Sequence, residues 1–174
     1  MNKKTPREVK LAWLSGIIDG EGTIAMYLVK NKDIIVQPIY GIYVCNSDIE
    51  MINEIKNIYD EIGLKYYFKA KNYKQGMFKQ NLVVYELKVS RRNEIEYLLE
   101  LIIPYLIAKK REAEVIYKFL KENPTSKLLK NRGNRSKKIN DNHQTYLETI
   151  NNFKQARQFG NLTPVETKRE TPIL

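Results

Sequence analysis

The sequence has almost none of the residues that build sulfur or imidazole metal sites. Its 174 residues contain one cysteine, Cys45, and one histidine, His143. A disulfide within the chain needs two cysteines, and zinc sites built on thiolates need several at defined spacings. An internal disulfide and a thiolate zinc site are therefore excluded, and imidazole-based sites are disfavoured. Any metal site is expected to use oxygen ligands.

Long apolar runs are also lacking. The first ten residues, MNKKTPREVK, are followed by no stretch long enough for a signal peptide or a membrane span. We therefore expect a cytoplasmic protein with neither segment, and an organelle interior stays open as the alternative. Apolar residues make up 43% of the chain, which is enough for the core of one ordinary domain.

Acidic residues are few compared with basic ones. Thirty lysines and arginines stand against twenty aspartates and glutamates, for a formal net charge of +10. Clustered cations favour a polyanionic partner, because neutralising phosphates releases counterions. Ribosomal and membrane-surface proteins share this bias, so the charge alone does not identify a nucleic-acid partner.

Apolar periodicity predicts an α+β fold. The expected order is helix, hairpin, helix, hairpin, helix, with a twisted antiparallel four-stranded sheet shaped like a saddle and extra C-terminal helices. The expected ranges are a helix at 6–20, strands at 23–30 and 36–45, a helix from Ser47 or Asp48 to Gly63, strands at 65–71 and 80–89, and helices at 92–103 and 109–123. Residues 1–122 are expected to form the core, while 123–174 form a basic connector, a helix and a tail packed on the same domain.

The first helix carries two apolar stripes. One stripe holds the bulky residues Leu11, Leu14 and Ile18. The second includes small residues and consists of Val9, Trp13, Gly16, Ile17 and Gly20. A helix packed on one side needs one stripe, so the second predicts a dimer interface at which two backbones approach closely. A helix in the middle of a monomeric core is the alternative.

Both hairpins carry polar and aromatic side chains at alternate positions, with lysines near the turns. A twisted antiparallel ribbon fits the major groove of DNA, where such side chains reach bases and phosphates. A solvated sheet face is the alternative. The candidate nucleic-acid contacts are Tyr27, Val29, Lys30, Lys32, Gln37, Ile39, Tyr43, Tyr67, Lys69, Lys71, Lys74, Lys79, Gln80 and Lys88.

The segment after the core is polar and strongly basic. Its candidate phosphate contacts are Arg132, Arg135, Lys137 and Lys138. These cations could hold the flanks of a long DNA site. A solvated loop is an equally good interpretation of the same composition.

Two acids stand at the end of the first helix. Asp19 lies in the last turn, where the helix dipole disfavours a negative charge, so we expect an arginine or backbone amides as its partner. Glu21 follows between two glycines, which allow a sharp turn and close approach to a ligand. Magnesium prefers oxygen ligands, so the Glu21 carboxylate and the Gly20 carbonyl are candidate ligands if DNA supplies others. A plain turn is the alternative.

In this context the stretch LSGIIDGEG, Leu14 to Gly22, resembles the signature motif of the LAGLIDADG homing endonucleases. Ser15 replaces the motif alanine, Gly20 replaces the second alanine, and Glu21 replaces the final aspartate. The resemblance covers roughly residues 5–122, because the expected order of helices and hairpins is similar to the core of that family. Glutamate is one methylene longer than aspartate, which implies an altered metal geometry.

The resemblance implies a function and site residues. Glu21 and the Gly20 carbonyl would bind Mg²⁺, with Mn²⁺ as an alternative ion, and the catalytic residues would be Glu21, Asn46 and Lys109. Asn46 would orient water, and Lys109 would lie near the scissile phosphate. Lys110 is an additional DNA contact and the alternative for the Lys109 role. No second motif is present, so the family implies a homodimer that recognises a long, nearly palindromic duplex and leaves short 3′ overhangs, as in intron homing.

Other classes compete with this interpretation. An RNA maturase that helps an intron to fold, or a non-cutting nucleic-acid-binding relative, would keep the basic sheet without needing the acid. A structural protein of a large RNA complex would need no divalent ion. The run YGIY at 40–43 resembles one element of a different nuclease class, but the YIG element of that class does not follow at a short interval.

Overall fold

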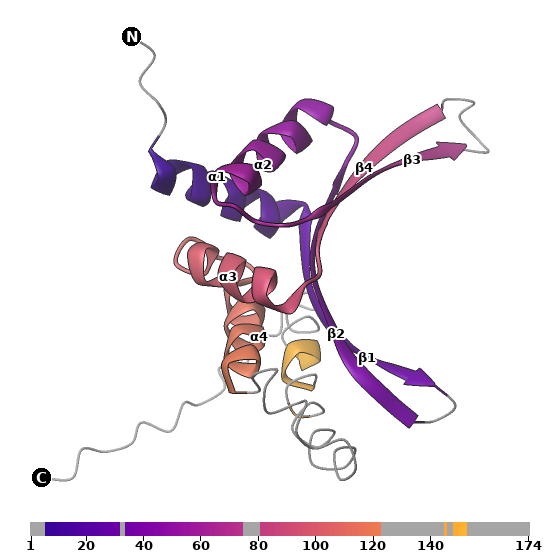
Figure 1. Cartoon of the computed structure of the whole chain (residues 1–174), viewed down its shortest axis with the longest axis vertical. Helices are drawn as coiled ribbons and strands as arrows, with labels where there is room; N and C mark the ends of the chain where they lie inside the picture. The colour runs from indigo at the N-terminus through magenta and orange to yellow at the C-terminus, as the bar shows by residue number, and fades with distance from the viewer. Residues whose placement is uncertain (1–5, 32–33, 75–80, 123–144, 146–147, 153–174) are drawn as a thin grey trace, which may run out of the picture.

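The chain forms an antiparallel sheet with helices against one side (Figure 1). The computed structural model describes residues 6–31, 34–74, 81–122, 145 and 148–152, with the backbone alone at 28–31, 34–38, 73–74 and 81–82. In chain order the elements are α1 (Arg7–Gly20), β1 (Gly22–Asn31), β2 (Ile34–Asn46), α2 (Ile49–Glu61), β3 (Tyr67–Lys74), β4 (Asn81–Val89), α3 (Arg92–Ile102) and α4 (Lys110–Glu122).

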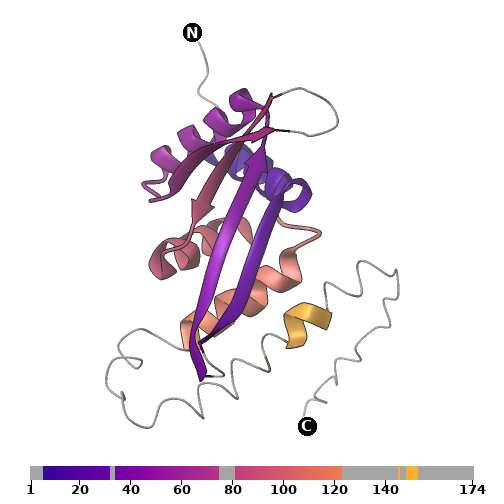
Figure 2. The same ribbon diagram turned by 90° about the vertical axis from the view of Figure 1, so that its right-hand side faces the viewer.

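The strands lie in the order β1-β2-β4-β3, and every neighbouring pair is antiparallel. The two hairpins meet where β2 pairs with β4, from Ile42 opposite Val89 to Asn46 opposite Tyr85. Beyond that central pairing the hairpins diverge, and the sheet curves with the helices on its convex side (Figure 1). The concave side is turned toward the viewer in Figure 2. The predicted α+β class and the helix and hairpin order are confirmed.

The hydrophobic core lies between the convex side of the sheet and the helices. Alternate strand residues point into it, and each of the helices α1 to α4 adds an apolar face. Its most buried members include Leu14, Ile18, Ile24, Ile42, Val44, Ile52, Ile55, Ile58, Leu87, Val89, Leu98, Leu99, Ile102, Ile116 and Phe119. The stripe predicted from Leu11, Leu14 and Ile18 is buried in this core.

Local signals explain where α2 begins and ends. The Asp48 carboxylate accepts hydrogen bonds from the amides of Glu50 at 2.9 Å and Met51 at 3.1 Å, as an N-cap residue should. Gly63 follows the helix with a φ of 71°, a conformation that costs glycine little. The start of α1 differs from the prediction, because Pro6 precedes the first helical residue and its side chain makes no cap.

The segment after α4 is described only in part. Residues 148–152 are helical, and Ile150 is buried in the core. The basic connector, with Arg132, Arg135, Lys137 and Lys138, lies outside the described residues. None of the helices described is both long and apolar enough to cross a membrane.

Candidate functional site

Helix α1 has an exposed apolar face opposite its buried one. Val9 and Trp13 are 54% and 38% exposed, Gly16 and Gly20 are exposed, and Ile17 is half-buried. A methyl group added at Gly16 or Gly20 would meet no atom within 4 Å. The second predicted stripe is therefore accessible in this chain, and packing within the chain does not require glycine at either position.

The end of α1 places Glu21 at the surface. Glu21 is the C-cap residue, its amide donates to the Ile17 carbonyl at 2.8 Å, and its side chain is exposed. Gly22, in contrast, is buried at the start of β1. A methyl group there would lie 2.7 Å from the Ile18 Cα, so β1 can leave the helix this closely only without a side chain. The backbone thus presents the Glu21 carboxylate at the foot of α1.

Asp19 is held by backbone amides, as its position in the last turn predicted. Its carboxylate accepts hydrogen bonds from the amides of Ile107 at 2.7 Å, Ala108 at 3.1 Å and Lys109 at 2.8 Å. These amides precede α4, so one carboxylate connects the end of α1 to the start of another helix 90 residues later. Three N–H groups also offset the unfavourable helix dipole around this charge.

Lys109 reaches the same helix end as Glu21. Its side-chain ammonium group donates to the backbone carbonyl of Asp19. Glu21 follows Asp19 by two residues, so the lysine and the glutamate lie at one end of α1, although 88 residues separate them in the sequence. The structure therefore brings two of the three predicted catalytic residues to the foot of α1.

Asn46 is the last residue of β2, and Lys110 is the first of α4. The side-chain oxygen of Asn46 accepts a hydrogen bond from the Asp48 amide at 2.9 Å, so this residue also shapes the turn before α2. Lys110 is partly exposed. Ser15, where the motif resemblance has alanine, is buried and donates to the Leu11 carbonyl at 2.7 Å.

The predicted nucleic-acid contacts with described side chains on the strands share the concave face. Strand pairing places Tyr43 between Thr23 and Lys88, and Lys88 opposite Tyr67, in a row across all four strands. The core residues Ile24, Val44 and Leu87 alternate with them and point the other way. The members of this face are Tyr27, Ile39, Tyr43, Tyr67, Lys69, Lys71 and Lys88.

Aromatic and cationic groups contact one another on this concave face. The Lys88 ammonium group lies 5.2 Å from the centre of the Tyr43 ring. The pKa of Tyr43 is raised to about 12. Partial burial is the largest cause, and a hydrogen bond with Tyr27 is the next largest. The Tyr43 phenol is thus protonated at neutral pH and can serve as a hydrogen-bond donor or acceptor.

Several predicted contacts are described only as backbone or not at all. Val29 is the pairing partner of Gln37, Lys30 that of Ile35, and Lys74 that of Asn81, but their side chains are outside the described part of the chain. Lys32, Lys79 and Gln80 also lie outside the described residues.

One carboxylate on the concave face was missed from the sequence. Glu86 lies on β4 opposite Cys45 and Lys69, and Lys71 donates a hydrogen bond to its carboxylate. The sequence does indicate this position, because Glu86 and Lys88 are two residues apart in β4 and such residues share one face of a strand. This acid is absent from the predicted contacts because a surface that meets phosphates is expected to use cations and neutral polar groups.

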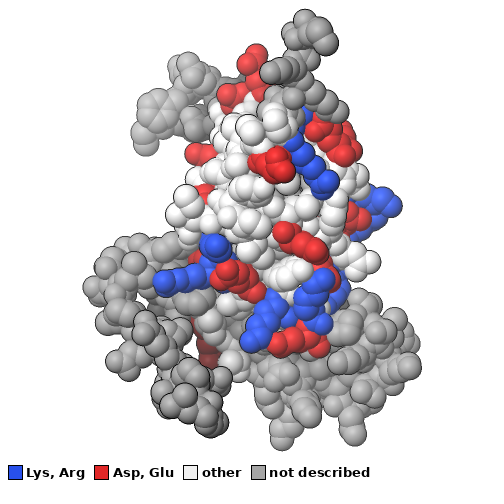
Figure 3. Space-filling view, turned by 90° about the vertical axis from the view of Figure 1, so that its left-hand side faces the viewer, with Lys and Arg blue, Asp and Glu red and all other residues white. Residues whose placement is uncertain are grey.

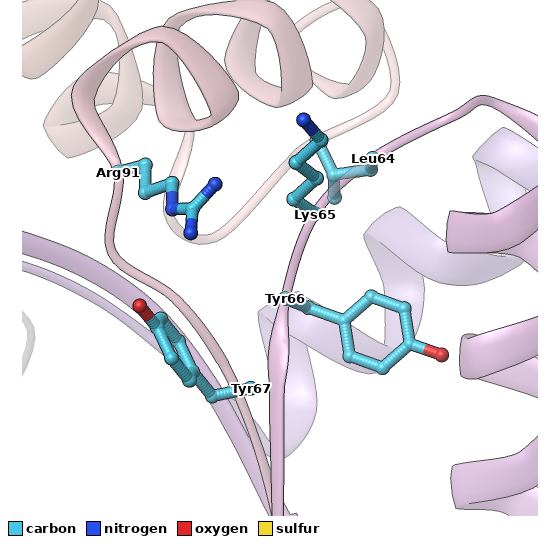
Figure 4. Close-up of a pocket in the computed structure, with 5 residues that line it drawn as sticks. All are labelled: Leu64, Lys65, Tyr66, Tyr67 and Arg91. Atoms are coloured by element: carbon cyan, nitrogen blue, oxygen red, sulfur yellow. The ribbon is translucent and has the colours of Figure 1, made fainter.

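A cavity of about 330 Å³ borders the sheet beside β3. It is lined by Leu64, Lys65, Tyr66, Tyr67 and Arg91. Figure 4 shows Arg91 and Lys65 extending from two neighbouring linkers, with the Tyr67 ring on the side of Arg91 and the Tyr66 hydroxyl pointing away. This cavity does not include Glu21 or Lys109.

Charge differs between the two sides of the molecule. Figure 3 shows the helix side, where acidic and basic groups are interspersed among uncharged ones. On the concave face, the described strand side chains include Lys69, Lys71 and Lys88 but one acid, Glu86. A surface with this excess of cations is suited to a polyanion.

No group of three or more metal-ligating side chains occurs within the described residues. The exposed oxygen donor at the foot of α1 is the Glu21 carboxylate, and the Gly20 carbonyl belongs to the same turn. Carboxylate and carbonyl oxygens suit Mg²⁺, which commonly takes one or two carboxylates and keeps further oxygen ligands from water or phosphate. The donor chemistry fits the predicted ion, and one chain supplies one such carboxylate.

This arrangement defines an α+β protein with a curved, basic sheet and an acidic helix end beside it. Solved structures share the fold. The homing endonuclease I-CvuI in complex with its target in the presence of calcium superposes with a TM-score of 0.51 at 20% identity, over 83% of this chain and 96% of that one. The LAGLIDADG homing endonuclease I-GzeII in complex with a DNA target has a TM-score of 0.53 at 17% identity, over 94% of this chain and 53% of that one.

The meganuclease I-SmaMI bound to uncleaveable DNA gives a TM-score of 0.50 at 17% identity, over 84% of this chain and 44% of that one. No family model matches the sequence, and no curated protein matches it either. The chain has the fold of the LAGLIDADG homing endonucleases, as the motif resemblance predicted. At identities of 20% or less, these similarities establish the fold and leave the activity to be argued from the site.

Proposed function

We propose that this protein is a homing endonuclease, which binds a long DNA site as a homodimer and makes a double-strand break. The observation that carries the proposal is the foot of α1, where an exposed Glu21 carboxylate and the Lys109 side chain lie at the same helix end. I-CvuI, I-GzeII and I-SmaMI, which share the fold, were each solved with DNA. The basic concave face beside Glu21 is suited to double-stranded DNA, which is the partner that this proposal requires.

The dimer is inferred from the exposed face of α1. Two such helices can pack through Val9, Trp13 and Ile17, while Gly16 and Gly20 leave room for close backbone approach. The chain spans nearly all of I-CvuI but about half of I-GzeII. One copy therefore corresponds to half of the larger protein, which supports a two-fold pair.

The pair would complete the metal site. Glu21 from each protomer, with the Gly20 carbonyl, would hold Mg²⁺ or Mn²⁺ together with DNA oxygens. When bound, such an ion supplies an activated water and stabilises charge on the phosphate. The two acids would lie at the same ends of the two paired helices, where a duplex can reach both.

The other residues of the site act on the phosphate and on water. Lys109 would offset negative charge that develops on the scissile phosphate, since its ammonium group is held at the end of α1 by the Asp19 carbonyl. Asn46 would orient water through its amide nitrogen, which has two donors, while its side-chain oxygen accepts a hydrogen bond from the Asp48 amide.

The concave faces of the two sheets would bind successive half-sites in the major groove. Alternate strand residues such as Tyr27, Tyr43 and Lys69 would face the bases and phosphates. Two-fold symmetry then requires a nearly palindromic target. Cleavage across the intervening minor groove would leave short 3′ overhangs.

The test is cleavage of a randomised duplex library by the full chain, with Mg²⁺ and with chelator, followed by sequencing of the new ends. We expect one long, nearly palindromic sequence to be cut, with 3′ overhangs, and we expect cutting only when Mg²⁺ is present. Binding without cutting under every metal condition would contradict the nuclease. It would favour a maturase or another non-cutting relative, and RNA would then be tested as the ligand.

A further inference from the structure

Glu86 is an acid on a face that is otherwise cationic. Among the described side chains of the four strands it is the sole carboxylate. It lies in the middle of the concave face, opposite Cys45 on β2 and Lys69 on β3. An acid at the centre of a surface that meets phosphates would weaken binding by repulsion, unless a cation neutralises it or it accepts a hydrogen bond from the nucleic acid.

Glu86 has a cationic neighbour on the same face. The Lys71 ammonium group donates to its carboxylate, and the side chains of Lys71 and Glu86 are 35% and 24% exposed. Both side chains are partly exposed, so a ligand can reach the two charged groups. A base pair that supplies one donor and one acceptor would replace the hydrogen bond that the two side chains lose when they turn toward it.

The pair presents a hydrogen-bond acceptor beside a donor. In the major groove, a C·G base pair offers the cytosine N4 amino group as donor and guanine O6 and N7 as acceptors. Glutamate accepts from cytosine N4, and lysine donates to guanine O6 or N7. Adenine also has an amino donor, but its N7 acceptor lies beside that donor and would face the carboxylate.

We propose that Glu86 and Lys71 together recognise one C·G base pair in each half-site, with Glu86 on cytosine and Lys71 on guanine. This inference rests on the proposed function, because it assigns a specificity-determining role within the DNA-binding face. Tyr43 and Lys88 lie in the next row of the sheet and are positioned to contact the neighbouring base pair or its phosphates.

The test is selection of bound duplexes from a randomised library, without divalent ions so that no DNA is cut. Glu86→Gln keeps the shape of the side chain but adds an amide donor, and glutamine pairs with adenine N6 and N7. We expect the parent to prefer cytosine at one position of each half-site, and Glu86→Gln to lose roughly tenfold of that preference and to gain adenine.

Two further variants complete the design. Glu100→Gln removes a carboxylate from α3, in the helix layer, and should select the parent sequence. Lys71→Met retains the acid and removes the donor, so preference should fall at the same base pair as in Glu86→Gln. This second variant carries the test if Glu86→Gln does not fold.

The outcomes separate this inference from the proposed function. A parent that enriches a defined site, with the same base preferences retained in Glu86→Gln and Lys71→Met, would overturn the role of the pair and leave the DNA-binding function in place. A parent that enriches no sequence at all would overturn both.

Discussion

Asp19 binds Lys109 twice, through two different groups. Its carboxylate accepts the backbone amide of Lys109 at 2.8 Å, and its carbonyl accepts the ammonium group of the same lysine. The first acid of the motif is therefore a positioning residue for a lysine that lies 90 residues away in the sequence. Glu21, two residues further along the chain, has an exposed side chain.

Replacing Asp19 with alanine should impair both stability and cleavage. Three backbone amides would no longer have a charged acceptor, and hydrogen bonds to charged groups contribute about 1.5–3 kcal/mol each. Relief of the charge at the helix C-terminus offsets part of that loss. Water can also replace the lost acceptor at the exposed amides of Ile107 and Ala108, so we expect the free energy of unfolding to fall by about 2 kcal/mol in chemical denaturation.

Lys109→Met is the matched control for Asp19→Ala. It leaves the carboxylate and its three amide bonds in place, so it should slow single-turnover cleavage with little change in the denaturation midpoint. Equal destabilisation by both variants would contradict the separate roles given to the two residues.

Two glycines of the motif should respond in opposite ways to alanine. Gly16→Ala should stabilise the single chain by up to about 1 kcal/mol through helix propensity, since its new methyl group meets no atom within 4 Å. The same methyl group should weaken self-association about tenfold or more by overpacking two close helices. Sedimentation velocity across a concentration series measures this effect.

Gly22→Ala is the companion variant. Its methyl group would lie 2.7 Å from the Ile18 Cα and 2.8 Å from the Ile18 carbonyl oxygen. These are backbone atoms, so we expect a loss of about 1–3 kcal/mol in folding stability.

A Gly16→Ala protein that self-associates as tightly as the parent would argue against this face of α1 as the dimer interface.

The concave face should determine how strongly DNA binding depends on salt. Lys69 is exposed on β3, and its replacement by glutamine removes one cation from each protomer. The slope of log affinity against log salt should become shallower by about 0.9 for each phosphate that is no longer neutralised, or about 1.8 for the dimer. Lys118→Gln, on the exposed surface of α4, should leave the slope unchanged.

Alkaline pH should destabilise the fold through Tyr59. This side chain is 1% exposed, and burial raises its pKa well above the ordinary value of 10. The unfolded chain loses this proton near pH 10 while the folded chain keeps it, so stability is full below pH 10 and declines above it. Tyr59→Phe should reduce the decline by up to about 1.4 kcal/mol per pH unit.

Denaturation curves at several pH values measure that slope. Between about pH 7 and pH 9 the parent and Tyr59→Phe should show parallel pH dependence, because the phenol stays protonated in both the folded and the unfolded chain. Curves that remain parallel from about pH 10 to pH 12 would rule out this contribution.

Much of the fold follows from local patterns in the sequence. The spacing of Leu11, Leu14 and Ile18 predicts the buried face of α1, and the leftover stripe with Trp13 predicts the exposed one. Asp48 and Gly63 mark the ends of α2 because capping depends on residues within a few positions. Strand ends differ from the prediction by up to three residues, since pairing partners determine them more than propensity does.

Contacts between distant segments were harder to predict. The helix dipole predicts that Asp19 needs amides or an arginine, but it does not indicate that the amides are those of Ile107 to Lys109. Nor does any local pattern place Lys71 on the carboxylate of Glu86, because that contact depends on the register of β3 against β4.

The most direct test of the proposed mechanism compares the parent with Glu21→Gln on the DNA site that the parent selects, measuring both cleavage and affinity in Mg²⁺. The two side chains have the same shape and differ in charge, and the Glu21 side chain is exposed rather than packed in the core. We expect Glu21→Gln to lose cleavage while it binds the site with nearly the affinity of the parent. A Glu21→Gln protein that cuts at the parental rate would contradict the assignment of this carboxylate as the centre of the reaction.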